Sequence, residues 1–243
     1  MSFNQVYITN TSSFFPNEPV SNDDMEDFLG HINGQPSKSK RIVLRNNGIK
    51  NRYYALTKER KATHTNAQIT AEAVRTLVGN DDAGLKSIEL LSCGTSTPDQ
   101  MMPAHGVMVH GLLPEMNPVE VISPAGVCCA GMHALKYAFM AIKTGDVHKA
   151  VATGSERFST SLVAGVFEDE AKKLSSLEEN PYIAFEKEFL RWMLSDGAAA
   201  FMMSDKPNKD GISLKIEWME GFSMQTNWKP ACTAPAKNNL MAV

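Results

Sequence analysis

The chain has 243 residues, of which 43% are hydrophobic and 21% are charged, and its formal net charge is −3. These values are typical of a globular protein with a sizeable core. No apolar run reaches the ~18 residues of a membrane-spanning helix, and residues 1–5 lack the features of a signal peptide, so we expect a cytoplasmic protein without a membrane span.

Strand and helix signals alternate along the chain. Strands are expected at residues 5–10, 88–93, 119–123, 149–154, 198–204 and 212–219. Helices are expected at residues 21–32, 65–78, 103–112 and 130–144. Residues 158–190 are charged and irregular, which indicates an excursion over the surface. Strands separated by helices predict an α/β fold with a parallel or mixed sheet covered on both faces.

Two of the expected helices carry specific end signals. Thr65 and Gln68 have the spacing of a capping box at the start of the helix at 65–78. Gly145 stands directly after the helix at 130–144, where a C-terminal cap belongs. That helix is almost entirely apolar, so we expect it to be buried at the centre of the sheet.

The turn before the apolar helix carries two of the four cysteines. It reads Ala125-Gly126-Val127-Cys128-Cys129-Ala130-Gly131-Met132 and follows the expected strand at 119–123. A cysteine on a strand-to-helix turn lies at the positive end of the helix, which stabilises a thiolate. The other two cysteines, Cys93 and Cys232, are expected to be structural. The cysteine spacings show neither a metal site nor a disulfide framework.

Positive charge is concentrated in residues 38–61, which we call the basic strip. It holds nine Lys and Arg residues against one acidic residue, a net charge of +8, so the remaining chain is at −11. The strip is either a solvated surface or a docking site for something anionic, such as a phosphate-bearing cofactor or an acidic protein. A nucleic acid is disfavoured because the rest of the chain would repel it.

Five stretches resemble, in order, landmarks of one enzyme family. They are Arg45-Asn46-Asn47-Gly48-Ile49-Lys50-Asn51-Arg52, Cys93-Gly94-Thr95-Ser96-Thr97-Pro98-Asp99, Cys129-Ala130-Gly131, Gly154-Ser155-Glu156 and Ser195-Asp196-Gly197-Ala198-Ala199-Ala200. The chain resembles the N-terminal half of a β-ketoacyl-acyl-carrier-protein synthase III, in the thiolase superfamily. A narrower resemblance is to the dialkylresorcinol-forming ketosynthases of flexirubin and aryl-polyene pigment pathways.

The resemblance implies a thiolase-like α/β fold of five layers, αβαβα, built from two similar halves. This chain would supply one half, with a mixed five-stranded sheet covered by helices. Residues 1–205 would form that half with its nucleophile, and residues 206–243 would begin the connection to a missing C-terminal half. The resemblance also implies a homodimer that pairs through the strand and helix around the nucleophile.

The implied reaction is acyl transfer followed by carbon–carbon bond formation in fatty acid, lipid or polyketide biosynthesis. The family's cysteine takes an acyl group from a thioester, and a malonyl-carrier thioester then loses CO₂ and attacks the acyl-cysteine. Cys129 matches that nucleophile because Ala130 and Gly131 follow it, and backbone N–H groups nearby would form the oxyanion hole. Cys128 is expected to point off the other side of the turn as a packed neighbour.

The family's decarboxylation step uses a histidine and an asparagine whose motifs do not occur in this sequence. His133 is expected to pack in the core, and His105 and His110 are expected to be ordinary, partly buried residues. We therefore expect the chain to be a fragment of a longer protein, inactive in condensation on its own.

The carrier of the acyl group can also be predicted. Arg41 stands where the family often has a tryptophan that stacks on the adenine of coenzyme A, which favours a primer bound to an acyl carrier protein. Arg41, Arg45 and Arg52 are the candidate carrier-binding residues, and the partner would be an acidic acyl carrier protein. No tightly bound cofactor or metal is expected, only the phosphopantetheine thioester of the carrier protein, or coenzyme A, as substrate carrier.

A cysteine peptidase and a non-catalytic subunit are the two other classes of function. A cysteine peptidase needs a histidine and an orienting group beside the thiol, and the sequence marks no such partner. A non-catalytic subunit shaped like a ketosynthase is the main alternative, and the retained cysteine argues against it.

Overall fold

The computed structural model describes residues 3–79, 81–166, 168 and 189–222. The chain divides into two compact units. The first, which we call the sheet unit, contains Met1–Pro16, His64–Arg157 and Gly197–Gly221. Among the described residues, the second unit contains 17–63, 158–166, 168, 189–196 and Phe222.

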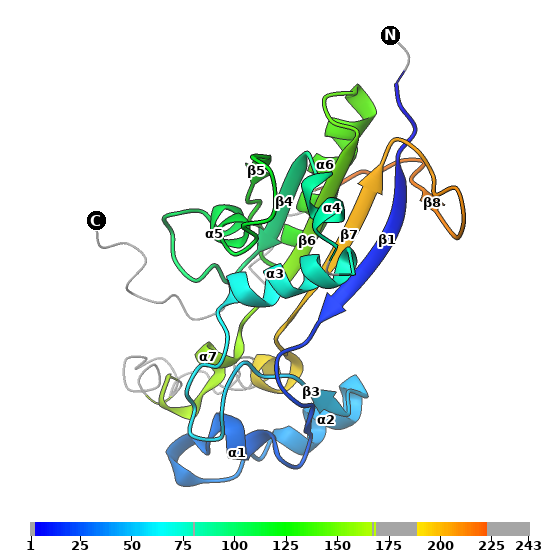
Figure 1. The fold of residues 1–243 in the computed structure, drawn as a ribbon. Coiled ribbons are helices and arrows are strands. Elements are labelled where there is room, and N and C mark those ends of the chain that lie inside the picture. The colour runs from blue at the N-terminus through cyan, green and yellow to red at the C-terminus, as the bar shows by residue number, and fades with distance from the viewer. Residues whose placement is uncertain (1–2, 80, 167, 169–188, 223–243) are drawn as a thin grey trace. The chain divides into compact units, whose positions relative to one another are not determined.

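The sheet unit is built on a mixed sheet whose strand order is β5-β4-β6-β7-β1-β8. The strands are β1 (Tyr7–Phe14), β4 (Leu90–Thr95), β5 (Glu120–Ile122), β6 (Lys149–Glu156), β7 (Gly197–Ser204) and β8 (Leu214–Lys215). Strand β4 pairs in parallel with β5 and β6, whereas β7 is antiparallel to both β6 and β1 (Figure 1). The predicted mixed α/β sheet is confirmed.

The sheet has six strands rather than five, because β8 adds a short pairing to β1 beyond the five longer strands. The strand expected at residues 212–219 is reduced to Leu214 and Lys215, both of which are exposed. Its neighbour Ile212 is also exposed, whereas Ile216 and Met219 in the same expected segment are partly buried and pack against the core without extending the strand.

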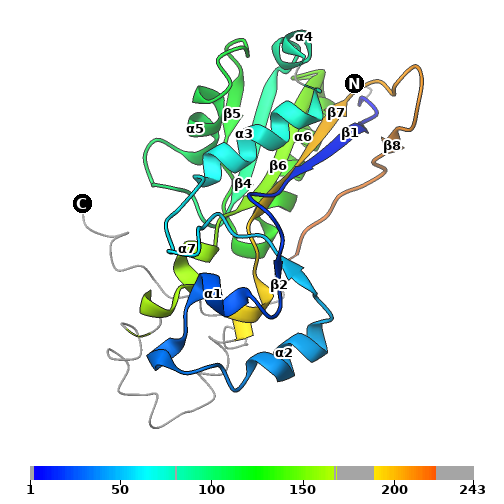
Figure 2. The ribbon, with the colours of Figure 1, turned by 60° about the horizontal axis from the view of Figure 1, so that its bottom comes forward.

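Helices cover both faces of this sheet (Figures 1 and 2). They are α3 (Asn66–Leu77), α4 (Asp82–Lys86), α5 (His105–Gly111) and α6 (Ala130–Thr144), the last preceded by the 3-10 turn η2 (Val127–Cys129). On β6, Ala150 and Ala152 share a hydrophobic cluster with α6, while Ser155 is hydrogen-bonded to Thr70 of α3. Because alternate strand residues point to opposite faces, α3 and α6 lie on opposite sides of the sheet.

The predicted helix ends are confirmed. The Thr65 hydroxyl accepts from the backbone N–H of Gln68 at 3.1 Å, and the Gln68 side chain accepts from the Thr65 N–H at 2.8 Å. Gly145 ends α6 in the left-handed conformation, with φ 83° and ψ 17°. Both signals could be read from the sequence because a cap depends only on residues within a few positions of it.

Helix α6 is buried on one face only, which corrects the expectation of a helix buried throughout. Ala134, Ala138 and Ile142 are fully buried against the sheet. Met132 and Met140 on the other side are 57% and 46% exposed. Helix α6 therefore has more apolar side chains than one face of the sheet covers.

Three glycines allow the first turn of α6 to approach the sheet backbone. A Cβ atom on Gly94 of β4 would lie 2.2 Å from the carbonyl oxygen of Ala130. A Cβ atom on Gly131 would lie 3.2 Å from the Cα atom of Gly154 on β6. The backbone at the start of α6 therefore lies directly against the backbone of β4 and β6, and this fixes the position of Cys129 just before it.

The second unit contains β2 (Val20–Ser21), α1 (Met25–Leu29), η1 (Ile32–Gly34), α2 (Lys40–Asn47), β3 (Asn51–Arg52) and α7 (Ser159–Leu162). Its core includes the fully buried Trp192 together with Met25, Leu29 and Val43. The helix expected at 21–32 is shorter, as α1. Helix α2 was not predicted, although Gly48 ends it in the left-handed conformation that glycine favours.

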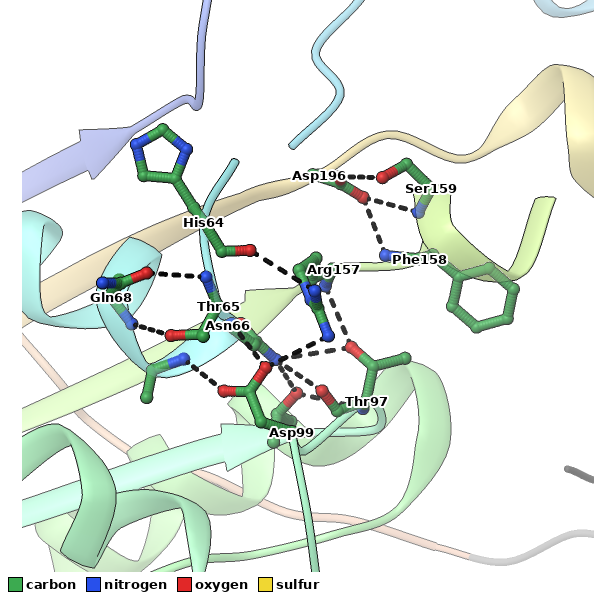
Figure 3. A network of polar contacts seen from close by, with 12 residues as sticks. His64, Thr65, Asn66, Gln68, Thr97, Asp99, Arg157, Phe158, Ser159 and Asp196 are labelled. Atoms are coloured by element: carbon green, nitrogen blue, oxygen red, sulfur yellow. Dashed lines mark hydrogen bonds and ion pairs between the residues drawn. The ribbon is translucent and has the colours of Figure 1, made fainter. Parts of the chain in front are cut away.

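The expected excursion at 158–190 begins with α7, and most of it lies outside the described residues. Asp196, from the last of the five family-like stretches, is buried in the second unit. Its carboxylate accepts hydrogen bonds from the backbone N–H groups of Ala55, Phe158 and Ser159 and from the Ser159 hydroxyl (Figure 3). Burial nevertheless raises the pKa of Asp196. This acid connects segments far apart in sequence and has no exposed reactive group.

Replacing Gly94 with alanine should destabilise the sheet unit because the new methyl group meets a backbone carbonyl that cannot move aside cheaply. We expect Gly94→Ala to lower the free energy of unfolding in urea by about 3 kcal/mol or more. Gly111→Ala is the matched control, because a Cβ atom there meets nothing within 4 Å. Equal unfolding midpoints for the two variants would contradict the proposed close contact.

Candidate active site

Cys129 lies at the N-terminal cap of α6, which runs for 15 residues. Strand β5 ends at Ile122, and four residues then lead into the turn η2. The Cys129 thiol is free and exposed. The predicted strand–turn–helix placement of this cysteine is therefore confirmed, whereas its role as nucleophile stays a prediction.

The turn that carries Cys129 has a strained backbone. Val127 adopts a φ of 52° and Gly126 a φ of 148°. A β-branched residue is rare in the left-handed region, and such a conformation costs on the order of 1–3 kcal/mol. The Cys129 N–H closes the turn by donating to the Gly126 carbonyl oxygen at 3.1 Å. Strain of this kind clusters at functional sites in proteins.

The cysteines other than Cys129 fall into different environments. Cys128 is exposed, so the expectation that it packs as a buried neighbour is wrong. Cys93 is fully buried on β4, and burial raises the pKa of its thiol to about 12, so it stays protonated as a structural residue. Cys232 lies outside the described residues.

His133 is exposed, and the expectation of core packing is wrong for it. Its Nδ1 atom lies 3.2 Å from the carbonyl oxygen of Ala125, eight residues back along the chain. Its ring occupies the space beside Gly126, where a Cβ atom would come within 2.9 Å of it. His133 therefore supports the turn before Cys129 from the first turn of α6.

His105 is buried more deeply than its sequence context suggested. Its Nε2 atom lies 3.2 Å from the hydroxyl of Thr70 and 3.3 Å from that of Ser155, while its Nδ1 atom has no hydrogen-bond partner among the described residues. Desolvation lowers the pKa of His105 to about 4, against a smaller opposing effect of Asp99. It is therefore neutral at pH 7 and belongs to the packing between α3, α5 and β6.

Two more of the family-like stretches meet at one polar cluster within the sheet unit (Figure 3). The Asp99 carboxylate accepts from the backbone N–H groups of Asn66 and Ala67 at 2.8 and 2.9 Å, and forms an ion pair with Arg157 at 3.2 Å. Asp99 therefore caps the start of α3 from a distant loop. The sequence marked Asp99 only as part of a family landmark, since nothing local pairs it with α3.

The loop after β4 is attached to the end of β6 by Thr97 and Glu156. The Thr97 hydroxyl donates to Glu156 at 2.6 Å and accepts from the Arg157 N–H at 2.9 Å. Glu156 also accepts from the Ser96 N–H at 2.8 Å. These side chains hold the ends of two parallel strands together, and Gly94 and Gly154 in the same strands contact the start of α6.

The three candidate carrier-binding arginines do not share one environment. Arg41 and Arg45 lie on α2 and are exposed. Arg52 is 1% exposed, and its guanidinium donates to the carbonyl oxygens of Asn51 and Trp192. The inclusion of Arg52 in a docking surface is therefore wrong: the residue organises the second unit, and burial lowers its pKa.

No cluster of three or more metal-binding side chains occurs among the described residues. In the same part of the chain, no helix is long and apolar enough to cross a membrane.

With this geometry established, similarity to known proteins identifies the fold. Over 152 residues, the chain is 29% identical to a β-ketoacyl-[acyl-carrier-protein] synthase III of Neisseria gonorrhoeae. Over 154 residues it is 32% identical to the synthase III of Neisseria meningitidis serogroup C. The chain is similar to the β-ketoacyl-acyl-carrier-protein synthases III and has a thiolase-like fold. Each matched segment covers 63% of this synthase III-like chain but only 44% of the relative.

Solved structures of condensing enzymes show the same fold. The tetronic acid condensing enzyme AbyA1 superposes with a TM-score of 0.63 at 20% identity, over 84% of this chain and 56% of that one. The 3-oxoacyl-(acyl carrier protein) synthase III of Pseudomonas aeruginosa gives a TM-score of 0.60 at 17% identity, over 85% and 53%. No family model matches the chain. The resemblance read from the motifs is confirmed, and the dialkylresorcinol-forming subfamily stays a prediction.

The buried His105 should make the synthase III-like chain less stable in acid. The unfolded chain protonates this residue near its ordinary pKa of 6.5, whereas the folded state keeps it neutral down to about 4. The unfolded state therefore binds the extra proton, and stability falls by about 3 kcal/mol as the pH drops through this window.

The measurement is urea unfolding of wild type and His105→Gln between pH 7.5 and 4. The variant lacks a titrating ring, so the stability difference between the two proteins should change across the window. A difference that is constant with pH would show that His105 titrates normally in the folded protein.

Proposed function

We propose that this chain carries the nucleophile of a condensing enzyme that forms carbon–carbon bonds from acyl thioesters. The observation that carries the proposal is the exposed Cys129 thiol at the start of a 15-residue helix, on a strained turn, in a chain similar to synthases III. Fatty acid biosynthesis is the pathway class that this similarity favours, and a cytoplasmic location is part of the same proposal.

In the proposed reaction, the Cys129 thiolate attacks the carbonyl carbon of an acyl thioester, and the carrier thiol leaves. A malonyl thioester then loses CO₂, and its carbanion attacks the acyl-cysteine carbonyl, which releases Cys129 and the β-ketoacyl product. The first N–H groups of a helix have no partner within it. At the start of α6 they would favour negative charge on the sulfur and on the developing oxyanion.

The acyl group would be delivered by an acidic acyl carrier protein as its phosphopantetheine thioester, with coenzyme A as the alternative carrier and no tightly bound cofactor. Arg41 and Arg45 support this proposal, because both are exposed on α2 and lie in a strip of strong positive charge. The names of the sequence relatives, which specify the acyl carrier protein, support it as well. Arg52 is left out because it is buried.

A homodimer is also proposed. Strand β5 is at the edge of the sheet and pairs only with β4 among the described strands, so its outer backbone groups face away from the sheet. Edge strands of this kind pair readily with another chain. The exposed Met132 and Met140 on neighbouring α6 would gain cover in the same contact.

Charge reversal on α2 should weaken carrier binding. We expect Arg41→Glu with Arg45→Glu to raise the Kd for an acidic acyl carrier protein, and added salt to weaken wild-type binding in the same direction. Lys209→Glu is the matched control, since Lys209 is an exposed cation outside the strip. Calorimetric titration that shows equal affinity for all three proteins would leave the strip as a solvated surface.

Condensation should depend on Cys129. We expect Cys129→Ala to reduce product formation from an acyl carrier thioester and malonyl carrier protein by about a hundredfold or more, measured in the longest protein that the reading frame encodes. The family's His and Asn are absent from residues 1–243, so these residues alone should not condense. Mass spectrometry should locate the acyl group on Cys129.

Cys128→Ala is the matched control, because it removes the neighbouring exposed thiol and leaves the proposed nucleophile in place. Acyl transfer to Cys128 with full activity in Cys129→Ala would show that the neighbour is the nucleophile. Unaltered condensation without either thiol would refute covalent catalysis here, and absence of acylation in the wild type would favour a non-catalytic subunit. Condensation by residues 1–243 alone would show that the family's His and Asn are not needed.

A further inference from the structure

Two consecutive thiols are exposed at the start of α6, and the proposed reaction uses only one of them. Cys128 and Cys129 are both free and accessible, within the three-residue turn η2 (Val127–Cys129). Cys93, the other cysteine of the described residues, is completely buried. The turn therefore presents a pair of exposed soft ligands on adjacent residues.

The spacing of adjacent residues decides what such a pair can bind. Consecutive Cα atoms are about 3.8 Å apart, whereas the Cα atoms of an unstrained disulfide lie about 4.4–6.8 Å apart. A direct sulfur–sulfur bond would therefore distort the turn. An atom that bonds to both sulfurs separates them further than a disulfide does, and neither thiol is enclosed by packing.

The number of available ligands limits which bridging atoms fit. Zinc in a structural site takes four protein ligands, and the described residues offer no cluster of three or more His, Cys, Asp or Glu side chains. Thiolates select soft acceptors. A trivalent arsenic atom that already carries one organic group needs only two sulfurs to complete its three bonds.

We propose that Cys128 and Cys129 form a vicinal dithiol site for trivalent arsenicals. The reaction with an arsenoxide makes two arsenic–sulfur bonds, and the two thiol protons leave with the oxide oxygen as one water molecule. No oxidation state changes. Binding needs two free thiols and does not depend on the proposed condensing activity, although it would occupy the proposed nucleophile.

The test is titration with phenylarsine oxide, in a Cys232→Ala background that removes the cysteine outside the described residues. The protein should bind one arsenical per chain. After binding, neither exposed thiol should react with Ellman's reagent, and the mass should rise by one phenylarsenic group minus two hydrogen atoms. Excess 2,3-dimercaptopropanol should reverse the binding. Cys128→Ala and Cys129→Ala should each weaken arsenical binding about a hundredfold, because one arsenic–sulfur bond lacks the added affinity of a second bond from the adjacent residue.

Wild-type affinity in either single variant, or retention of one free thiol in the complex, would overturn the inference. Urea midpoints of both variants should match the parent, since both side chains are exposed, and this separates loss of the site from loss of the fold. A protein that binds the arsenical but never becomes acylated would refute the proposed function and leave the dithiol site standing.

Discussion

The close approach of the first turn of α6 to strands β4 and β6 is the contact on which the candidate site depends. Gly94, Gly131 and Gly154 leave no side chain between helix and sheet at this point, so backbone meets backbone. Cys129 immediately precedes this contact and is fixed by it at the end of the helix. The left-handed Val127 and the bracing ring of His133 then determine how the turn leaves the sheet.

A second set of contacts holds the same strands at their ends. Asp99 joins the loop after β4 to the start of α3 and to Arg157, and Glu156 binds the same loop at Ser96 and Thr97. Hydrogen bonds to an ionised carboxylate are stronger than those between neutral groups, and several of them fix its position. The family-like stretches at 93–99 and 154–156 therefore join the ends of β4 and β6, the two strands that the start of α6 contacts.

The corrections to the sequence-based expectations share a cause. Arg52 lies within the basic strip yet is buried, while Arg41 and Arg45 in the same strip are exposed. His133 and Cys128 were expected to pack, and both are exposed. For the basic strip, composition predicted the average character of the segment correctly, whereas the apolar turn at 125–129 is exposed. The direction of one side chain depends instead on partners such as Trp192 and Ala125, which are far away or across a turn.

The sequence alone determined the elements whose signals are local: the capping box at Thr65, the glycine end of α6, the mixed α/β sheet, and the position of Cys129 between a strand and a helix. These depend on periodicity and on residues within a few positions of each other. Only the tertiary structure decided that Asp99 caps α3, that α6 has an exposed apolar side, and that Arg52 is enclosed. Such features depend on which distant segments meet, because burial and hydrogen bonding are set by the neighbours in space and not by those in sequence.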